Sequence, residues 1–285
     1  MAIAQLRREY HQRICEQIVR LQKDGSTTYP NFADKGSKAS RAIALGIINR
    51  LGFFPSSARI SGQATGRLFE SITRDFLREA FALLHHLRPG NWYYSIQAPI
   101  SDFEQYEHLA RLEHVIRGDN ELASALGKDY IITPDIVVGR QPVSEEEINR
   151  EGLVVTEEEP FAKFTPLRRV NFEAPRPILH ASISCKWTLR SDRGQNARTE
   201  ALNLIRNRKG HLPHVVAVTA EPLPTRIASL ALGTGDLDCV YHFALPELWD
   251  SIEEVGNEDQ LDMLMILIEG RRLRDISDLP FDLAT

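Results

Sequence analysis

The sequence has few cysteines and no long apolar run. Its 285 residues include three cysteines, Cys15, Cys185 and Cys239, whose spacing is not that of paired ligands. This excludes a structural zinc site and is typical of a protein kept in a reducing cytoplasm. No apolar stretch reaches the roughly 18 residues needed to span a bilayer, and the first residues are too charged for a signal peptide. We therefore expect a cytoplasmic protein.

An excess of positive charge is also missing. The chain has 34 lysines and arginines against 39 aspartates and glutamates, so its net charge at pH 7 is −5. This balance alone would argue against a nucleic-acid partner, but the two signs are segregated along the chain. Basic residues concentrate in 186–209, whereas acidic residues gather in 145–147, 157–159 and 247–262. The segregation predicts a basic cleft on an acidic body.

Length and composition predict one α/β domain. The length allows one large or two ordinary domains, but no repeat or detachable linker divides residues 1–285. We expect a central mixed β-sheet flanked by helices. Its parts are a mainly helical segment at 1–127, the sheet and its crossing helix at 128–245, and C-terminal helices at 246–285.

Hydrophobic periodicity predicts where the elements lie. Strands are expected at 130–138, 178–188, 214–219 and 238–243. Helices are expected at 3–22, 41–51, 66–87, 104–117, 194–208, 247–256 and 258–270. We expect a loop at 24–40 and, because residues 140–177 hold five prolines and many acids, a long excursion there. Loops of that length in a compact domain usually have a function.

The strand at 178–188 ends in polar residues that alternate with apolar ones. Successive side chains of a strand point to opposite faces of the sheet, so Ser182, Ser184 and Lys186 share one face. The other face is apolar and is expected to be buried. In the strand at 130–138, Pro134 precedes Asp135, and a proline there indicates an edge strand or a bulge.

These residue types suit metal-assisted phosphodiester chemistry. Mg²⁺ prefers one or two carboxylates together with phosphate oxygens and water, and Asp135 and Glu200 could supply the carboxylates. The backbone carbonyl of Cys185 could add an oxygen ligand. Lys186 could stabilise charge on the phosphate or help to deprotonate the attacking water.

A cluster of arginine and aspartate follows the lysine. Arg190, Asp192 and Arg193 lie at the expected start of the helix at 194–208. Arginine pairs bidentately with guanine O6 and N7, and a carboxylate accepts from cytosine N4. The cluster therefore suits a DNA site rich in G·C pairs.

Each of these signals has an ordinary structural explanation when it is taken alone. Asp135 could be a strand-end carboxylate, Lys186 a solvated strand end, and the Arg/Asp cluster a salt-bridge network at a helix start. Glu70 would be a surface residue of a long amphipathic helix, and loop positions such as Asp34 and Gln63 would be turn residues. Their joint order and spacing favour a nuclease.

The order Pro-Asp, Ser-x-Lys, Glu resembles a variant of the PD-(D/E)xK nuclease motif. The acid that normally lies two residues before the lysine is replaced by Ser184, and Glu200 supplies the displaced carboxylate from the neighbouring helix. The chain is similar to the type IIF restriction endonucleases that recognise sites with a CCGG core. The resemblance covers nearly the whole chain and is carried by the stretches 180–188, 190–193, 195–198, 207–210, 233–235 and 275–280.

The resemblance implies a restriction-endonuclease fold and a role for particular residues. It implies Mg²⁺ as cofactor, one or two ions per site, and cleavage of GCCGGC after the first G to leave 5′-phosphate and 3′-hydroxyl ends. The implied catalytic residues are Glu70, Asp135, Ser184, Lys186 and Glu200, with Asp135, Cys185, Glu200 and Glu70 around the metal. The implied DNA-binding residues are Arg190, Asp192 and Arg193 for the core and Asp34, Gln63 and Arg226 for the outer pair.

The resemblance also implies partners. It implies double-stranded DNA, a homotetramer built of two dimers, and a cognate DNA methyltransferase in the cell. Residues 141–178 resemble the region used for tetramer contacts, although their composition diverges from the family pattern.

Three other functions are compatible with parts of the pattern. A catalytically silent DNA-binding protein on the same fold is disfavoured by the intact Asp135, Lys186 and Glu200. A structure-selective nuclease is disfavoured by the Arg/Asp cluster, which reads sequence. A hydrolase using Ser184 or Ser182 with lysine is remote, because the sequence shows no element for an oxyanion hole.

Overall fold

The protein is described here by a computed structural model that covers residues 2–285 apart from 119–120, 122–131, 190 and 234, and without the side chains of 117, 171 and 191–195. Its centre is a six-stranded sheet with the order β3-β4-β5-β6-β7-β8. The antiparallel half contains β3 (Trp92–Ile96), β4 (Ile136–Arg140) and β5 (Ile178–Lys186). The parallel half runs from β5 to β6 (His214–Thr219), β7 (Cys239–His242) and β8 (Leu273–Asp275). The expected mixed α/β sheet flanked by helices is therefore confirmed.

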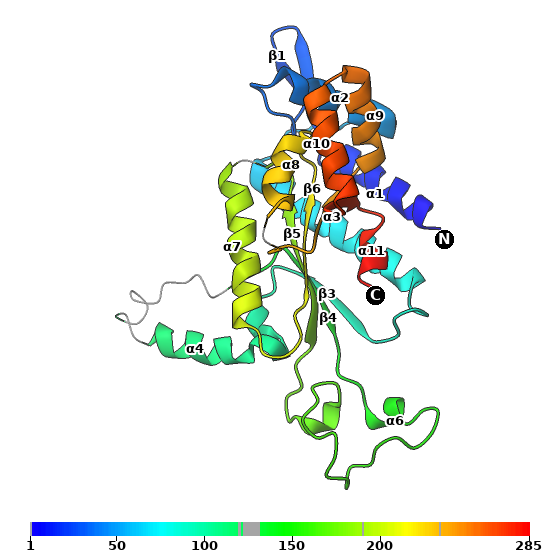
Figure 1. The fold of residues 1–285 in the computed structure, drawn as a ribbon, viewed down its shortest axis with the longest axis vertical. Coiled ribbons are helices and arrows are strands. Elements are labelled where there is room, and N and C mark those ends of the chain that lie inside the picture. The colour runs from blue at the N-terminus through cyan, green and yellow to red at the C-terminus, as the bar shows by residue number, and fades with distance from the viewer. Residues whose placement is uncertain (1, 119–120, 122–131, 190, 234) are drawn as a thin grey trace.

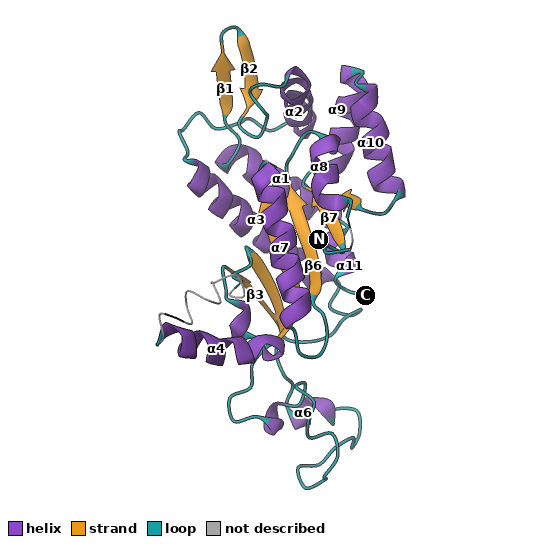
Figure 2. Ribbon diagram, turned by 60° about the vertical axis from the view of Figure 1, so that its left-hand side comes forward, coloured by secondary structure: helices purple, strands orange, loops and turns teal. Residues whose placement is uncertain are grey.

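Helices lie on both sides of this sheet (Figure 1), with α7 on one side and α1 and α3 on the other. Because parallel strands need a crossover connection, β5 and β6 are joined by α7, as expected. A two-stranded hairpin, β1 (Leu21–Asp24) and β2 (Thr27–Pro30), projects from one end (Figure 2). The helices are α1 (Ile3–Gln17), α2 (Lys38–Leu51), α3 (Gly62–Leu83), α4 (Glu107–Arg117), α6 (Glu145–Ile148), α7 (Ser191–Asn207), α8 (Pro224–Ala231), α9 (Leu245–Val255), α10 (Glu258–Glu269) and α11 (Leu279–Asp282).

Several predicted boundaries are wrong near the N-terminus. The first helix stops at Gln17 instead of residue 22, because the chain turns into the β1–β2 hairpin, where Gly25 has a φ of 61°. The same hairpin and the early start of α2 replace most of the loop expected at 24–40. The third helix begins at Gly62 instead of residue 66, because the Ser61 hydroxyl caps it by accepting the Ala64 N–H at 3.1 Å.

The prediction that Pro134 marks an edge strand is also wrong. β4 lies between β3 and β5, and Pro134 lies just before it, so the proline removes no ladder hydrogen bond. A bulge is present, but on β5: Val138 pairs with Ala181 and the next residue, Gly139, pairs with Leu179, which leaves one extra residue on β5. The part of the predicted strand at 130–131 lies outside the described residues.

Both faces of β5 are buried. The ring of Trp187, just beyond the strand, packs against Phe32 and against Phe69 of α3, with ring centroids 5.3 and 5.1 Å apart. On the opposite face Ser182 and Ser184 are buried too. The polar face that the alternation predicts is therefore present, but it is enclosed instead of open to solvent.

Residues 141–178 form the expected excursion, which extends away from the sheet in Figure 1. Its only regular pieces among the described residues are α6 and a turn of 3-10 helix at Arg169–Asn171, tied together by a bridge between Val143 and Arg168. Within the described part of the chain, every helix is too short or too polar to cross a membrane.

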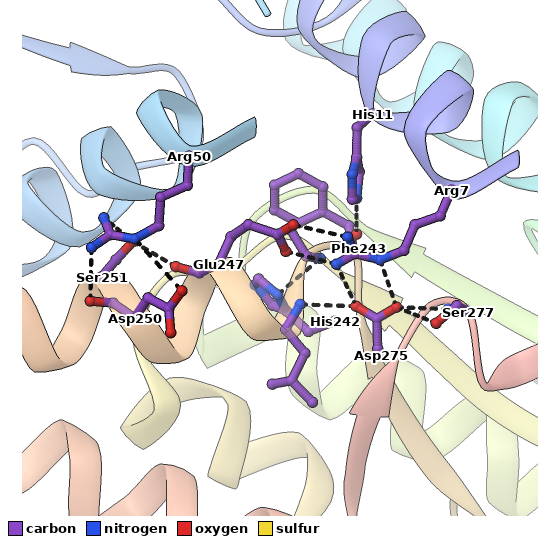
Figure 3. A network of polar contacts seen from close by, with 12 residues as sticks. Arg7, His11, Arg50, His242, Phe243, Glu247, Asp250, Ser251, Asp275 and Ser277 are labelled. Carbon is purple, nitrogen blue, oxygen red and sulfur yellow. Dashed lines mark hydrogen bonds and ion pairs between the residues drawn. The ribbon is translucent and has the colours of Figure 1, made fainter. Parts of the chain in front are cut away.

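A charged network joins α1 to α9 and β8 (Figure 3). The guanidinium of Arg7 donates to Asp275 at 2.8 Å and to Glu247 at 2.6 Å. Burial raises the pKa of both carboxyls, but hydrogen bonds and charge from Arg7 outweigh burial and leave each pKa below its ordinary value. The network closes the N-terminal helix onto the edge of the sheet.

Replacement of this buried carboxylate should cost stability. Asp275→Asn leaves Arg7 with one anionic partner, and we expect the free energy of unfolding at pH 7 to fall by about 2–3 kcal/mol. Since the folded pKa of Asp275 is depressed, its contribution is present above its ordinary pKa and is lost as pH falls through the folded value. Denaturant titrations between pH 7 and pH 3 measure both effects.

Asp250→Asn is the control for that measurement. Asp250 is exposed and lies 3.9 Å from Arg50, so its loss should change stability by no more than about 0.5 kcal/mol. Equal losses for the two variants would contradict the role given to the Arg7 network.

Candidate active site

Asp135 and Lys186 meet because of the register between β4 and β5. Ile136, the first residue of β4, pairs with Ile183, so Asp135 falls opposite the last residues of β5. Its Oδ2 accepts the Cys185 N–H at 2.7 Å and the Lys186 ammonium at 3.1 Å. Burial lowers the pKa of Lys186, but the charges of Asp135 and then Glu200 outweigh it and leave the pKa raised. The lysine is therefore a permanent cation at neutral pH.

The carbonyl of Cys185 faces the same side as this carboxylate. In a strand, the N–H and C=O of one residue point to the same neighbour, and the Cys185 N–H points at Asp135. The ladder between β4 and β5 ends at Ile183, so β4 offers no ladder donor to the Cys185 oxygen. The oxygen is accordingly placed to act as a ligand beside Asp135.

Glu200 reaches the same place from α7. It is half-buried, and its pKa is raised by burial first and by the charge of Asp135, against a lowering effect of Lys186. These interactions show that the helix turns Glu200 back toward the end of β5. Two carboxylates and one ammonium group thus share a partly enclosed site.

Glu70 comes to this site from α3, and it is buried. Its pKa is raised by burial and by the charge of Asp135. The side chain of Gln97 donates to its Oε2 at 3.4 Å. Gln97 has a φ of 54°, a conformation uncommon outside glycine, and its N–H donates to the Asp135 carbonyl at 3.2 Å. The sequence reasoning missed Gln97, because no local pattern predicts a positive φ at a glutamine.

The hydroxyl of Ser184 is buried and has no hydrogen-bond partner among the described residues. A buried polar atom without a partner is costly unless water or a ligand satisfies it. Ser184 lies two residues before Lys186 on the same face of β5, so its Oγ is a free hydrogen-bonding group close to the carboxylates.

These donors fit a hard divalent cation held in an open site. The negative charge of Asp135 raises the pKa of both Glu200 and Glu70, and a cation relieves that repulsion. No group of three histidine, cysteine or acidic side chains among the described residues forms a ready-made metal cage. Mg²⁺ needs none, since it keeps waters and binds through one or two carboxylates and substrate phosphates.

The residues expected to read the base sequence follow β5 directly. Arg190 lies outside the described residues. Asp192 and Arg193 lie in the first turn of α7, which begins at Ser191, three residues earlier than predicted. Their side chains lie outside the description, so only the position of their backbone at the start of the helix is established.

A second cluster lines a cavity of about 900 Å³. Arg226 of α8 forms an ion pair with Asp34, which brings together two of the three residues expected at the outer base pair. The third, Gln63, is exposed in the first turn of α3 and is not part of the cavity wall. Lys35 and Arg198 also line the cavity, and so does Glu221, which the sequence reasoning missed.

Comparison with known proteins gives three findings. The family described as NgoMIV restriction enzyme matches residues 10–285. The chain is 50% identical over 257 residues to the type II restriction enzyme NgoMIV of Neisseria gonorrhoeae, covering 88% of each chain. Two solved structures of Bse634I, one a type IIF restriction endonuclease with cognate DNA, cover 86% of this chain and 98% of theirs, at 12% and 13% identity and TM-scores of 0.38 and 0.35.

Proposed function

The chain belongs to the NgoMIV restriction enzyme family and is a type II restriction endonuclease that binds double-stranded DNA, and from this we propose that it cuts GCCGGC after the first G with Mg²⁺ as cofactor. The products are a 5′-phosphate and a 3′-hydroxyl. One observation supports the catalytic part above the others, namely that one oxygen of Asp135 accepts both the Cys185 N–H and the Lys186 ammonium.

The metal would be held by the carboxylates of Asp135 and Glu200 and the carbonyl of Cys185, with Glu70 bound through water. When bound, Mg²⁺ polarises the phosphate and makes a nucleophile available at neutral pH. Asp135 contributes in a second way, because its hydrogen bond to the Cys185 N–H fixes the carboxylate relative to the end of β5.

Lys186 is placed to act as a cation beside Asp135. Its raised pKa keeps it protonated at neutral pH, so it is suited to stabilise the negative charge that develops on the phosphate and to orient the attacking water. Of the two roles that the sequence allowed, the electrostatics favour charge stabilisation. Ser184, two residues earlier in the strand, offers an unpartnered hydroxyl for a water in the same site.

Recognition is divided between two elements. Arg190, Asp192 and Arg193, at the start of α7, read the CCGG core by the pairing of arginine with guanine and of carboxylate with cytosine. Asp34 and Arg226 are paired on the cavity wall and, with Gln63, read the outer G·C pair. A cognate methyltransferase would protect the same sequence in the cell.

Assembly is assigned to the excursion at 141–178. It exposes large apolar side chains on a segment that extends away from the sheet (Figure 1), and soluble chains rarely leave such groups uncovered without a partner. We propose that they pack against a second copy in a homotetramer of two dimers. The exposed apolar residues of this segment are Leu153, Val154, Phe161, Phe164, Val170 and Phe172.

A charge introduced into that surface should disrupt the tetramer. Phe164 is 97% exposed in the single chain, so Phe164→Asp should leave the fold intact and shift the protein toward dimers in sedimentation velocity, because an interface does not accept an unpaired carboxylate. Phe54→Asp is the matched control, since Phe54 is 91% exposed and lies shortly after α2, outside the excursion. An unchanged tetramer in Phe164→Asp would contradict the assignment.

The proposed function is tested with two plasmids, carrying one and two GCCGGC sites. Mg²⁺-dependent cutting only at GCCGGC, with sequenced ends one base inside the site, is the expected result. Faster cutting of the two-site plasmid would support a tetramer that acts on paired sites. Cutting at a different CCGG sequence would keep the catalytic assignment and place the error in Asp34, Gln63 and Arg226, whereas tight binding without cutting would contradict the mechanism.

A further inference from the structure

Glu221 lies at the floor of the cavity that Arg226 and Asp34 line, just beyond the end of β6. It is 1% exposed, and a carboxyl this buried is normally stabilised by an ion pair or hydrogen bonds, because burial without a partner is costly. Its partners lie in two segments, the connection after β5 and the start of α8. Both segments lead to proposed base-reading residues. None of the catalytic groups described above contacts it.

On one side Glu221 holds the connection between the catalytic lysine and the first reader. Its Oε2 accepts the N–H of Leu189 at 3.0 Å, and Leu189 directly precedes Arg190. The Glu221 N–H donates to the Thr219 hydroxyl at 3.1 Å, and that hydroxyl donates to the Lys186 carbonyl at 2.9 Å. The end of β6 therefore fixes both ends of the short connection between Lys186 and Leu189.

On the other side Glu221 holds the start of α8. Its Oε1 accepts the Leu223 N–H at 3.4 Å, and the same oxygen lies 3.8 Å from a guanidinium nitrogen of Arg226. Arg226 also pairs with Asp34. The carboxylate that contacts the outer reader, Arg226, thus also holds Leu189, the residue that precedes Arg190 in the sequence.

We propose that Glu221 is a positioning residue for sequence recognition, which keeps the readers of the CCGG core and of the outer pair in a fixed relation to each other and to Lys186. The inference rests on the proposed function. It predicts that loss of the Glu221 carboxylate relaxes discrimination at the core and at the outer pair together, although Glu221 itself touches no base.

The protonation of Glu221 supports this coupling. Burial raises its pKa to about 7, against the lowering effects of the Leu189 N–H, Arg226 and the Leu223 N–H, while Asp34 acts in the same direction as burial. The other charged or titratable groups around it are Lys35 and Arg198 on the cavity wall and His242 of β7, which bonds its backbone. The carboxylate is therefore present above about pH 7 and protonated below it, so discrimination should decline as pH falls through that range.

The test measures the preference for GCCGGC over other duplexes, without divalent metal so that no cutting occurs. The competitors are ACCGGT, altered in the outer pairs, and GCATGC, altered in the core. In Glu221→Gln we expect both preferences to fall by about tenfold or more, the loss that corresponds to one charge-assisted contact. Asp34→Ala should lose only the preference over ACCGGT. Glu104→Gln, which removes a half-buried carboxyl with a raised pKa before α4, should lose neither.

The pH profile separates positioning from a merely structural role. In the unaltered protein both preferences should decline below about pH 7, and in Glu221→Gln they should be low and independent of pH. Unchanged preferences in the variant, or a loss at the outer pair alone, would overturn the proposal. The proposal would also be overturned if Glu221→Gln lowered the melting temperature and weakened binding to non-specific DNA as much as binding to GCCGGC. If Glu221→Gln does not fold, a preference that does not change with pH in the unaltered protein would overturn the proposal. If the unaltered protein shows no preference for GCCGGC at all, the proposed function itself is wrong.

Discussion

Lys186→Ala should reduce cleavage of GCCGGC by about 10³-fold or more and leave sequence-specific binding within a few-fold. The ammonium group lies 3.1 Å from Asp135 and keeps its proton at neutral pH. It is therefore suited to stabilise charge that appears only in the transition state, and the loss of one such donor costs about 10²–10³ in rate. Loss of the contact to Asp135 adds to this, since the ammonium group also helps to fix the Asp135 carboxylate at the end of β5. Single-turnover cleavage and gel-shift binding measure the two properties separately.

Lys209→Ala is the control for this experiment. Lys209 is an exposed lysine just after α7, and its loss should leave the cleavage rate within a few-fold. If Lys186→Ala lost binding as strongly as cleavage, Lys186 would be a ground-state contact to DNA and the proposed catalytic role would be wrong. A pH–rate profile of the unaltered enzyme without an inflection from Lys186 below pH 9 would agree with its protonated state.

Arg226→Ala should weaken binding to GCCGGC by about 10- to 100-fold for each outer pair, because a good bidentate contact to guanine contributes about 1–3 kcal/mol. The loss should be seen as relaxed specificity, with ACCGGT bound nearly as well as GCCGGC while the core preference stays. Competition binding with the two duplexes measures this difference. A uniform loss for every sequence would show that Arg226 contacts phosphate and not a base.

The matched control is Arg274→Ala. Arg226 and Arg274 are each 37% exposed and each paired with an aspartate, Asp34 and Asp282, at 34% and 28% exposure. The two substitutions therefore remove similar half-exposed ion pairs, and both should leave stability nearly unchanged. Only the first is expected to change recognition.

The pairing of Arg226 with Asp34 is compatible with a reading role. An ion pair at this exposure contributes at most about 1 kcal/mol, so redirecting either group to a base costs little. The pair meanwhile holds the two side chains together on the cavity wall. Such preorganisation lowers the entropy lost on binding.

Periodicity in the sequence was sufficient to identify the helices and strands that bury one face or a continuous apolar run. The strand at 214–219 is confirmed in full, the strand at 178–188 is confirmed up to Lys186, and α7, α9 and α10 lie within three residues of their predicted bounds. Each has a local apolar pattern long enough to identify its type. The long excursion at 141–178 is also confirmed as mostly irregular structure.

Short elements with weak local patterns were not predictable. β3 and β8 are stabilised by pairing with β4 and β7, and α8 by packing against α10 and α7. The β1–β2 hairpin has a fully exposed first strand, so it has no alternating pattern to detect. In these cases the stabilising partners are distant in sequence, and tertiary contacts override the local signal.

The sequence by itself determined the chemistry of this protein, because residue types and covalent order are local properties. Pro-Asp, Ser-x-Lys and a later glutamate specify which groups can hold a metal and stabilise a phosphate, and the family follows from the same stretches. Only the tertiary structure decided which groups meet. The β4–β5 register brings Asp135 to Lys186. α3 brings Glu70 to the same place, and the end of β3 brings Gln97. Glu221, just beyond β6, meets Leu189 and the start of α8, the two segments proposed to carry the reading residues. These distances depend on strand register and packing between segments far apart in the chain, which no local pattern encodes.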